Sequence, residues 1–412
     1  MPSRPIRLLL FSTLYPSAAR PGHGLFVETR LRRLIDSGAV EARVIAPVPW
    51  FPSTDARFGA WARLAATPAT ASRHGIRIEH PRYLLPPRVG ETVAPLALAL
   101  GARTALARLI REGFDPDVID AHYYYPDGVA AALLGRWFGK PVTITARGSD
   151  LNVLGQHALP RRMMQWAGAQ AAGSIGVCQA LVDVLQSWGL DPRRLQVIRN
   201  GVDLQRFKPG VPAAARSQLG VTGAPVLLCV GNLVPVKGHD LLLQAIVKLR
   251  IHHPAASLYL VGDGPLRNTL QAQAVALGLA GQVHFVGTVP QDALVAWYSA
   301  ADVLVLPSRS EGWANVLLEA MACGTPVVAT DVGGSAEVLG DAGVGLLVPR
   351  RDADSLAETL GRLLARLPDR GAVRAYAEGF SWDHTTQAQL RLFRRIVHGA
   401  MDDASPPVRG TS

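Results

Sequence analysis

The chain has 412 residues, of which 49% are hydrophobic and 18% charged, a composition that excludes an intrinsically disordered protein. This length normally makes two domains, each with a core of its own. The formal net charge is +10, and residues 1–210 hold 26 Lys and Arg against 15 Asp and Glu, so the positive excess lies in the first half. Such an excess favours an anionic partner such as a membrane surface or nucleic acid, although an arginine-rich coding bias would also produce it.

The sequence shows no apolar run of about 18 residues, so we expect no membrane-spanning helix. The nearest candidate, VAPLALALG from Val93, is stopped by Arg103. The first residues lead directly into a strand pattern, without a signal-peptide cleavage region. Three cysteines, Cys178, Cys229 and Cys323, lie far apart in apolar runs, which predicts buried reduced thiols rather than disulfides or zinc ligands. These features together favour a cytosolic protein.

Strand and helix patterns alternate along both halves of the chain. Helices are expected at 26–38, from Pro95 and after Pro126. Strands separated by helices of this length predict parallel sheets with helices on both faces. The expected strands are 6–12, 42–47, 75–81, 117–122, 141–146, 173–178 and 195–200 in the first half, and 225–231, 257–262, 282–287, 302–307, 326–330 and 345–349 in the second.

The expected fold is therefore α/β, with two Rossmann-like domains at 1–205 and 224–384. The segment 206–223, rich in Gly, Pro and Ala, is predicted to be a linker. Two such domains facing each other make a deep cleft at the carboxyl edges of their sheets, where open α/β sheets bind ligands. A closing helix at about 385–401 is expected to complete the first domain, and 402–412 to form a disordered tail.

The most informative stretch is Ser308–Gly334, which reads SRSEGWANVLLEAMACGTPVVATDVGG. It predicts a helix over 315–323 between two strands, with its N-terminus at the carboxyl edge of a sheet, where an anion would bind. Glu311 precedes this helix and Glu319 lies within it, about 12 Å further along the axis at 1.5 Å per residue. Each carboxylate alone is equally well explained by the helix dipole or by a solvated face. Among apolar neighbours, however, Glu319 requires a hydrogen-bond donor.

This stretch resembles the signature of the retaining family 4 glycosyltransferases, which have the GT-B fold. In that family the first Glu contacts the transferred sugar and the second holds the ribose hydroxyls of the nucleotide. The resemblance implies that Glu311 is catalytic and that Glu319 binds the donor. It also implies that the leaving diphosphate contacts the backbone amides that start the helix, at Gly312, Trp313, Ala314, Asn315 and Val316.

Motifs in the first half agree with this resemblance. In PGHGLF, Gly22 and Gly24 would let the backbone approach a diphosphate ahead of a helix, although most such turns are only turns. His122, just past a strand, is similar to the family histidine that hydrogen-bonds the donor sugar, whereas a lone His is more often structural. In TARGSD, Arg147 stands where relatives commonly have His, and Asp150 matches an acidic position of the active cleft.

The second half supplies the remaining donor-binding candidates. Lys237, in VGNLVPVKG, is expected to bind the diphosphate as a point charge, while Asn232 stands where relatives usually carry Arg. VGDGPLR, which contains Gly264, also matches the family. Its G-x-G favours a dinucleotide site as well, but Arg267 occupies the sixth position and no acidic residue follows at the required distance. Thr288, in FVGTV, is expected to line the nucleobase.

Two Asp-x-Asp triplets, Asp115–Asp117 and Asp352–Asp354, would also suit a metal-bound nucleotide sugar. Both begin a predicted element, and turn and N-cap roles explain them. The sequence therefore predicts no metal.

We interpret the chain as a cytosolic, metal-independent glycosyltransferase that uses a nucleoside-diphosphate sugar of UDP or GDP type and retains the anomeric configuration. Its acceptor would be a glycan or a lipid-linked glycan, as in polysaccharide synthesis, and the basic half would contact an anionic membrane rather than nucleic acid. The alternatives are a sugar-nucleotide epimerase, an NAD-dependent oxidoreductase and a non-catalytic basic adaptor. The sequence leaves the sugar, the base and the acceptor open.

Overall fold

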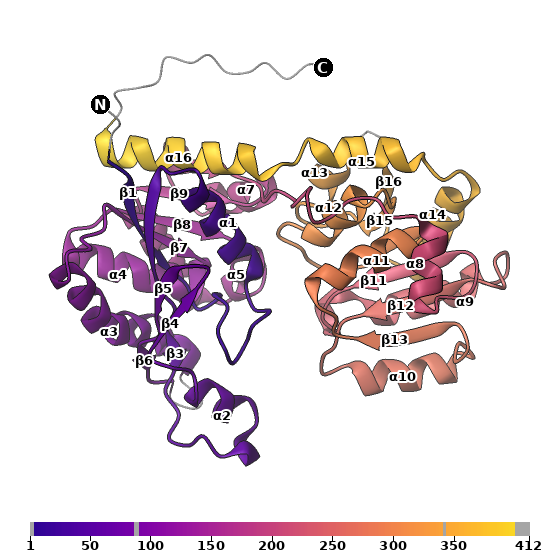
Figure 1. Cartoon of the computed structure of the whole chain (residues 1–412), viewed down its shortest axis with the longest axis horizontal. Helices are drawn as coiled ribbons and strands as arrows, with labels where there is room; N and C mark the ends of the chain where they lie inside the picture. Colours follow the sequence, from indigo (N-terminus) through magenta and orange to yellow (C-terminus); the bar gives the residue numbers. More distant parts are fainter. Residues whose placement is uncertain (1–3, 86–89, 341–342, 400–412) are drawn as a thin grey trace. The chain divides into compact units, whose positions relative to one another are not determined.

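The computed structural model describes residues 4–85, 90–340 and 343–399 (Figure 1). The chain folds into two compact units. The first comprises Met1–Val177, Leu181–Ile198 and Thr385–Ser412, and the second comprises Cys178–Ala180 and Arg199–His384. The units therefore meet in the sequence at Ile198, a little before the expected boundary at 205. The tail predicted at 402–412 lies outside the described residues.

The first unit is built on an eight-stranded sheet in the order β10-β9-β8-β7-β1-β2-β5-β4. All neighbouring strands are parallel except β4 and β5, which form a hairpin that the sequence pattern did not predict. Its two turn residues, His74 and Gly75, both have positive φ, as the tightest hairpin turns require. The strands are β1 (Ile6–Phe11), β2 (Val40–Ile45), β4 (Thr70–Arg73), β5 (Ile76–Glu79), β7 (Val118–His122), β8 (Val142–Ala146), β9 (Gly173–Gly176) and β10 (Leu195–Val197).

Helices cover this sheet, and the last helix of the chain belongs to the same core. Leu390 and Phe393 of α16 (Trp382–His398) lie in one hydrophobic cluster with Leu8 of β1 and Leu31 of α1 (Leu25–Asp36). The C-terminal segment is therefore an integral part of the first unit. The other helices are α3 (Gly90–Arg111), α4 (Val129–Phe138), α5 (Ser149–Asn152), α6 (Ala158–Gln170) and α7 (Gln179–Ser187).

Residues 46–69 and 80–85, on either side of the β4–β5 hairpin, form a lobe that the sequence pattern did not predict. It holds a small parallel sheet of β3 (Val48–Pro49) and β6 (Arg82–Tyr83), together with α2 (Ala60–Ala65). Figure 1 shows α2 projecting away from the main sheet of the first unit. A cluster of aromatic rings supports the lobe, since Phe51 stacks on Trp61 with centroids 5.7 Å apart.

Helix α3 departs from expectation in two ways. It begins at Gly90, before Pro95, because a helix can continue through a proline at the loss of one backbone hydrogen bond. Its segment Thr92–Arg111 is also long and apolar enough to cross a membrane, contrary to our reading of the sequence. Leu98 and Leu106 are fully buried in the unit, and a core helix of a folded domain meets the same criteria. Leu96 and Leu100 on the same helix are about half exposed.

The second unit contains a six-stranded sheet in the order β13-β12-β11-β14-β15-β16, parallel throughout. The chain first moves outward from β11 (Val226–Val230) to β12 (Ser257–Val261) and β13 (Val283–Gly287). It then returns to the other side of β11 with β14 (Val303–Leu306), β15 (Val327–Thr330) and β16 (Gly345–Val348). The strand order thus reverses between β11 and β14, and ligands of open α/β sheets bind outside such a point.

Helices α9 (His239–Leu249) and α14 (Ala353–Ala365) supply apolar residues to the core of this sheet, and α12 (Asn315–Ala322) ends before Gly324 in the left-handed conformation, as expected. The predicted linker 206–223 requires correction. It contains α8 (Pro212–Leu219), and Arg216 from this helix pairs with Asp302 at 2.7 Å. Proline at the first helical position and three alanines make this segment a helix of the second unit. The remaining helices are α10 (Arg267–Ala276), α11 (Leu294–Ala300), α13 (Ser335–Leu339) and α15 (Arg370–Glu378).

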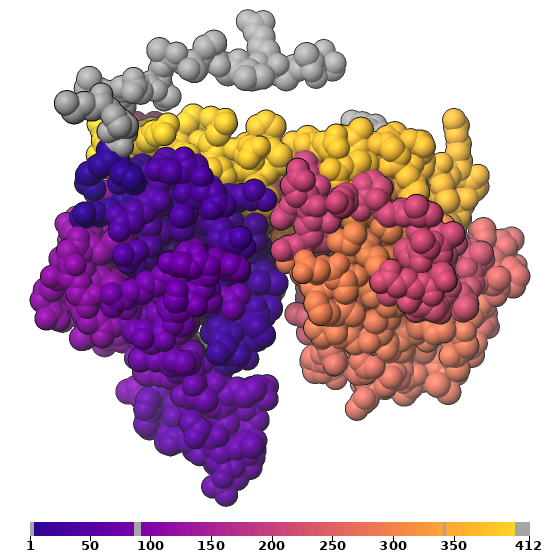
Figure 2. All heavy atoms as spheres, in the orientation of Figure 1, coloured from indigo at the N-terminus to yellow at the C-terminus, as the bar shows by residue number. Residues whose placement is uncertain are grey.

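Figure 2 shows the lobe as a protrusion on the surface of the first unit.

Candidate functional site

The loops that follow β11 and β14 carry the first group of predicted residues, and they lie side by side because these strands are neighbours. Lys237 Nζ donates to Glu311 Oε1 at 2.6 Å, and Ser308 Oγ donates to the same oxygen at 2.6 Å. The backbone also joins the loops, since the N–H of Arg309 donates to the carbonyl of Val236 at 2.7 Å. The fold therefore brings the predicted cation and the predicted catalytic carboxylate into direct contact.

A glycine lets a third loop approach this group. Gly333, after β15, has a φ of +54°, and a Cβ atom there would lie 1.9 Å from the carbonyl oxygen of Glu311. The next residue, Gly334, donates its N–H to the carbonyl of Gly312 at 3.1 Å. The backbone of the loop before α12 is thus held in place by backbone, which explains why the sequence carries a Gly-Gly pair there.

The N-terminus of α12 has open donor capacity. Its N-cap is Ala314, which has no side-chain acceptor for the first amides of the helix. The N–H of Asn315 donates to the carbonyl of Trp313 at 3.0 Å, so this predicted diphosphate donor is already engaged. The Asn315 side chain accepts from Asn200 at 3.2 Å. Val316 follows in the first turn, and the buried indole N–H of Trp313 has no partner. These groups make the turn suitable for an anion.

The structure supplies the donor that Glu319 requires. The hydroxyl of Tyr298, from α11, donates to Glu319 Oε2 at 2.8 Å, and Tyr298 is fully buried. Burial raises the pKa of Glu319, while this hydrogen bond and the positive charge of Arg206 act against the rise. Arg206 in turn donates to Gln291 at 2.8 Å. Sequence analysis did not identify Tyr298, although a carboxylate among apolar residues indicated that such a partner must exist.

Two more predicted donor-binding residues occupy the loops after β12 and β13. These loops touch through the N–H of Gly262, which donates to the carbonyl of Gly287 at 2.9 Å. Gly264 lies in the first loop and Thr288, which is exposed, in the second. Asn232, in the loop after β11, is also exposed. All three therefore lie at the carboxyl edge of the same sheet as Lys237.

In the first unit, His122 ends β7 and is almost completely buried, with 1% exposure. Its Nε2 lies 3.1 Å from Asp120 Oδ2, and its Nδ1 contacts the guanidinium of Arg147. Burial lowers the pKa of His122 to about 4, so the ring is neutral at pH 7. A neutral ring that donates from Nε2 to a carboxylate accepts at Nδ1, which matches the guanidinium donor. Both ring nitrogens are thus engaged within the unit.

A buried hydrogen-bond network holds Asp120, and through it His122, in place. Asp120 accepts from Thr143 Oγ1 at 2.7 Å and from Gln389 Nε2 at 2.9 Å. The side-chain amide oxygen of Gln389, Oε1, accepts from Arg30 Nε at 2.7 Å, and Arg30 is 1% exposed. Sequence analysis missed Arg30 and Gln389, which are 359 positions apart. It also missed Asp120, although this residue lies two positions before His122 on β7 and therefore on the same face of the strand.

Arg147 is the member of this network that is partly exposed. Its guanidinium also lies over the ring of Phe26 at 4.9 Å from the centroid. Asp150, predicted to bind the donor, is buried and accepts the backbone N–H groups of Tyr124 and Gly148, both at 2.8 Å, and that of Arg147 at 3.1 Å. The Asp150 carboxylate therefore shapes the loop that presents Arg147.

The glycine loop after β1 is held equally tightly. Gly24 is the N-cap of α1 with a φ of +69°, and a Cβ atom there would lie 1.4 Å from the carbonyl oxygen of Leu14. Nearby, Thr13 donates its N–H and its hydroxyl to Asp127 at 2.8 and 2.9 Å. In contrast, Gly22 has open space around its Cα. Gly24 is thus required by the turn itself, and Gly22 is the more accessible of the two.

The Asp-x-Asp triplets have structural partners. Asp117 pairs with Arg4 at 2.7 Å, and Asp352 caps α14 by accepting the N–H of Ser355 at 2.7 Å. Residues 4–85, 90–340 and 343–399 contain no group of three or more His, Cys, Asp or Glu side chains arranged to hold a metal ion. The three cysteines are buried free thiols, as predicted.

Comparisons with known proteins agree with this geometry. Residues 61–206 match the family model described as Glycosyltransferase Family 4, and residues 213–379 match Glycosyl transferases group 1. A D-inositol 3-phosphate glycosyltransferase of Frankia alni is 36% identical over 330 residues, which cover 73% of this chain and 80% of that protein. D-inositol 3-phosphate glycosyltransferase 2 of Catenulispora acidiphila is 32% identical over 430 residues and covers 96% of each chain.

Solved structures share the fold. Sucrose-phosphate synthase from Thermosynechococcus elongatus has a TM-score of 0.79 at 23% identity, covering 96% of this chain and 100% of that one. HepE of Anabaena, solved in complex with UDP, has a TM-score of 0.70 at 22% identity, covering 94% and 98%. The two family models, the identity with curated glycosyltransferases and the two parallel-sheet units lead to one conclusion: the chain belongs to the family 4 glycosyltransferases, which have the GT-B fold.

Proposed function

We propose that this glycosyltransferase moves a sugar from a nucleoside-diphosphate donor to an acceptor hydroxyl with retention of anomeric configuration. The observation that carries the proposal is the composition of the site in the second unit. Lys237, Glu311 and Ser308 meet beside the uncapped N-terminus of α12, and Glu319 follows on the same helix with its own buried donor. The UDP and UDP-glucose complexes of HepE, a protein of the same fold, support a donor of this class.

Each residue then has a chemical task. Negative charge grows on the leaving diphosphate in a transition state that resembles a glycosyl cation, and Lys237 and the free amides of the α12 N-terminus stabilise it. Glu311, which now accepts from Lys237 and Ser308, orients the sugar. Glu319 accepts from the ribose hydroxyls and is held by Tyr298. In this scheme Lys237 and helix amides replace a metal ion.

Retention constrains the geometry of attack. The acceptor hydroxyl approaches from the face that the diphosphate leaves, and an oxygen of the diphosphate takes its proton. No side-chain nucleophile is needed, and none is assigned. His122 acts by positioning Arg147, because both nitrogens of its ring are already engaged. Arg147 supplies the guanidinium that relatives carry at the position of Asn232.

The proposal extends to the acceptor and to the place in the cell where the enzyme works. The curated relatives act on D-inositol 3-phosphate by name, so a phosphorylated cyclitol is the first acceptor to test, followed by glycan and lipid-linked acceptors. A cytosolic enzyme with lipid-linked acceptors would work at the membrane surface. The half-exposed Leu96 and Leu100 of α3, together with the basic excess of residues 1–210, support such a peripheral contact.

Thermal unfolding of the purified chain with UDP, GDP and ADP sugars tests the donor assignment. We expect one nucleotide class to raise the melting temperature, because ligand binding stabilises the folded state. With D-inositol 3-phosphate added, NMR of the product would then show the donor's anomeric configuration. An inverted product would refute retention. Stabilisation by NADH, or interconversion of donor sugars without transfer, would instead support an oxidoreductase or an epimerase.

A further inference from the structure

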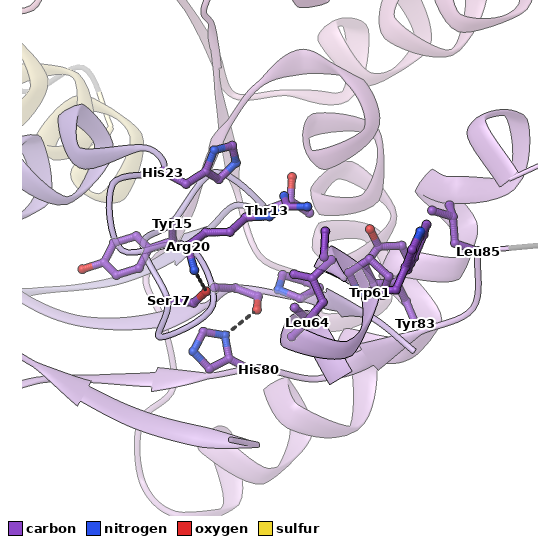
Figure 3. A pocket seen from close by; sticks show the side chains of 15 residues that line it. Thr13, Tyr15, Ser17, Arg20, His23, Trp61, Leu64, His80, Tyr83 and Leu85 are labelled. Carbon is purple, nitrogen blue, oxygen red and sulfur yellow. Dashed lines mark hydrogen bonds between the residues drawn. The ribbon is translucent and has the colours of Figure 1, made fainter. Parts of the chain in front are cut away.

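The first unit contains a cavity with a volume of about 390 Å³ between the loop after β1 and the lobe (Figure 3). The loop contributes residues within 13–23, and the lobe contributes residues within 46–49, 60–64 and 80–85. A space of this size suits a small molecule. The cavity lies at the carboxyl edge of the sheet, because the loop after β1 forms one of its walls.

Hydroxyl-binding groups line this cavity. His80 is 3% exposed, and its Nδ1 lies 2.8 Å from the carbonyl oxygen of Ala46, so Nδ1 carries the proton. Burial lowers the pKa of His80, which leaves a neutral ring whose Nε2 is an acceptor. Burial raises the pKa of Tyr83 to about 12, so its phenol keeps its proton and can donate. The cavity thus offers both partners that a sugar hydroxyl uses.

An aromatic ring provides a flat wall. Trp61, on α2, is 43% exposed and is backed by Phe51, with the planes of the two rings 29° apart. The backing holds the indole in one orientation. Figure 3 shows Trp61 and Tyr83 on the lobe side of the cavity and Arg20 and His23 on the loop side. Aromatic faces of this kind pack against the C–H groups of a ring-shaped ligand.

The lining of the cavity carries one charged side chain, a cation. Among its fifteen lining residues there is one arginine, Arg20, and no carboxylate. We do not assign the neighbouring Arg82 to ligand binding, because its guanidinium donates to the backbone carbonyls of Leu64 and Ala65, both at 3.0 Å. Burial and the charge of Arg20 together lower the pKa of His23, so this second histidine is also neutral. An anionic group would therefore find its counter-charge at Arg20.

We propose that this cavity is an acceptor site for a polyhydroxylated ring that carries a phosphate or a carboxylate. This inference rests on the proposed function, since it assigns the acceptor of that reaction. Trp61 packs against the ring, His80 Nε2 and the hydroxyl of Tyr83 bond to its hydroxyls, and Arg20 pairs with the anionic group. The lobe, which supplies three of these four groups, determines acceptor choice.

Isothermal titration of the full chain without nucleotide sugar tests the proposal, because it measures acceptor binding independently of transfer. The probes are D-inositol 3-phosphate against inositol, glucuronic acid against glucose, and inorganic phosphate alone. We expect at least one anionic ring to bind at least tenfold more tightly than its neutral counterpart. Arg20→Gln should remove this preference, while Arg111→Gln, an exposed arginine at the end of α3 outside the cavity, should preserve it.

Several results would overturn the proposal. These are equal affinity for charged and neutral rings, a preference that survives Arg20→Gln, inorganic phosphate binding as tightly as the phosphorylated ring, or no saturable binding of any ring. Arg20 is exposed, so its substitution leaves the core intact. Trp61→Ala should weaken charged and neutral rings alike. If the chain binds anionic rings through Arg20 but transfers no sugar to them, the proposed function fails and the cavity assignment stands.

Discussion

Removing the carboxylate of Glu319 should weaken nucleotide binding, and the hydrogen bonds that this carboxylate accepts set the expected size of the loss. The buried hydroxyl of Tyr298 donates to Glu319 Oε2 at 2.8 Å, and Gln291 is a second hydrogen-bond partner of the carboxylate. We assign the remaining acceptor capacity of the two oxygens to the ribose hydroxyls. A hydrogen bond to a charged group contributes about 1.5–3 kcal/mol. Glu319→Ala should therefore raise the Kd of the nucleoside diphosphate by about 10-fold to 150-fold.

A second variant separates the carboxylate from its support. Tyr298→Phe removes the donor but keeps the ring, so the pKa of Glu319, already raised by burial, should rise further. A protonated carboxyl accepts the ribose hydroxyls less well, so the affinity of this variant should fall relative to the parent as the pH is lowered from 8 to 5. The matched control is Tyr259→Phe, which removes a hydroxyl that bonds to Thr222 at 2.9 Å in the same unit.

Isothermal titration with the nucleoside diphosphate that stabilises the chain measures both effects. Equal affinity in Glu319→Ala and the parent would remove Glu319 from the ribose site. An affinity of Tyr298→Phe that keeps the parent's pH dependence would refute the positioning role of Tyr298.

Four further outcomes are expected. His122→Ala should lower turnover more than nucleotide affinity, because His122 positions Arg147; a parallel loss of both, measured by kinetics and titration, would contradict this division. Arg147→Ala should reduce kcat tenfold to a hundredfold, about 1.4–2.7 kcal/mol, with partial recovery by Asn232→Arg. If Arg147→Ala left kcat nearly unchanged while Arg309→Ala strongly reduced it, the cation that stabilises the leaving diphosphate would come from the second unit instead. Transfer should persist in excess EDTA, and a loss that added metal reverses would refute metal independence. Binding to anionic liposomes should weaken as salt screens the basic charges of residues 1–210. Liposome binding that does not change with salt concentration would show that these charges do not mediate it.

The sequence predicted the sheets well because buried parallel strands are continuous apolar runs. All thirteen predicted strands are present, and the helix after Glu311 begins where it was expected. The lobe escaped prediction because its strands β3 and β6 are only two residues long and pair across more than thirty residues. Such pairing depends on the surrounding fold rather than on a local period.

The site was predicted unevenly for a related reason. Glu311 and Lys237 stand at strand ends, where topology alone brings residues together, and the structure shows them in contact at 2.6 Å. The partners of His122 were not predicted. Asp120 precedes it by two residues on β7, whereas Arg147 lies in the loop after β8, so the pairing of these two strands is what brings the guanidinium to the ring. Arg30 and Gln389 are 359 positions apart, so no sequence pattern connects them.

That last contact has a consequence for the order in which the chain is completed on the ribosome. The second unit ends at His384, whereas the first still lacks α16 at that stage of synthesis. Until Gln389 has been synthesised, its hydrogen bond to Asp120 and the hydrogen bond that it accepts from Arg30 Nε cannot form. The N-terminal unit, although translated first, therefore reaches its finished structure last. A chain terminated prematurely at residue 384 would keep the residues that we propose to bind the nucleotide and would lose the hydrogen bond from Gln389 to Asp120, the partner of His122.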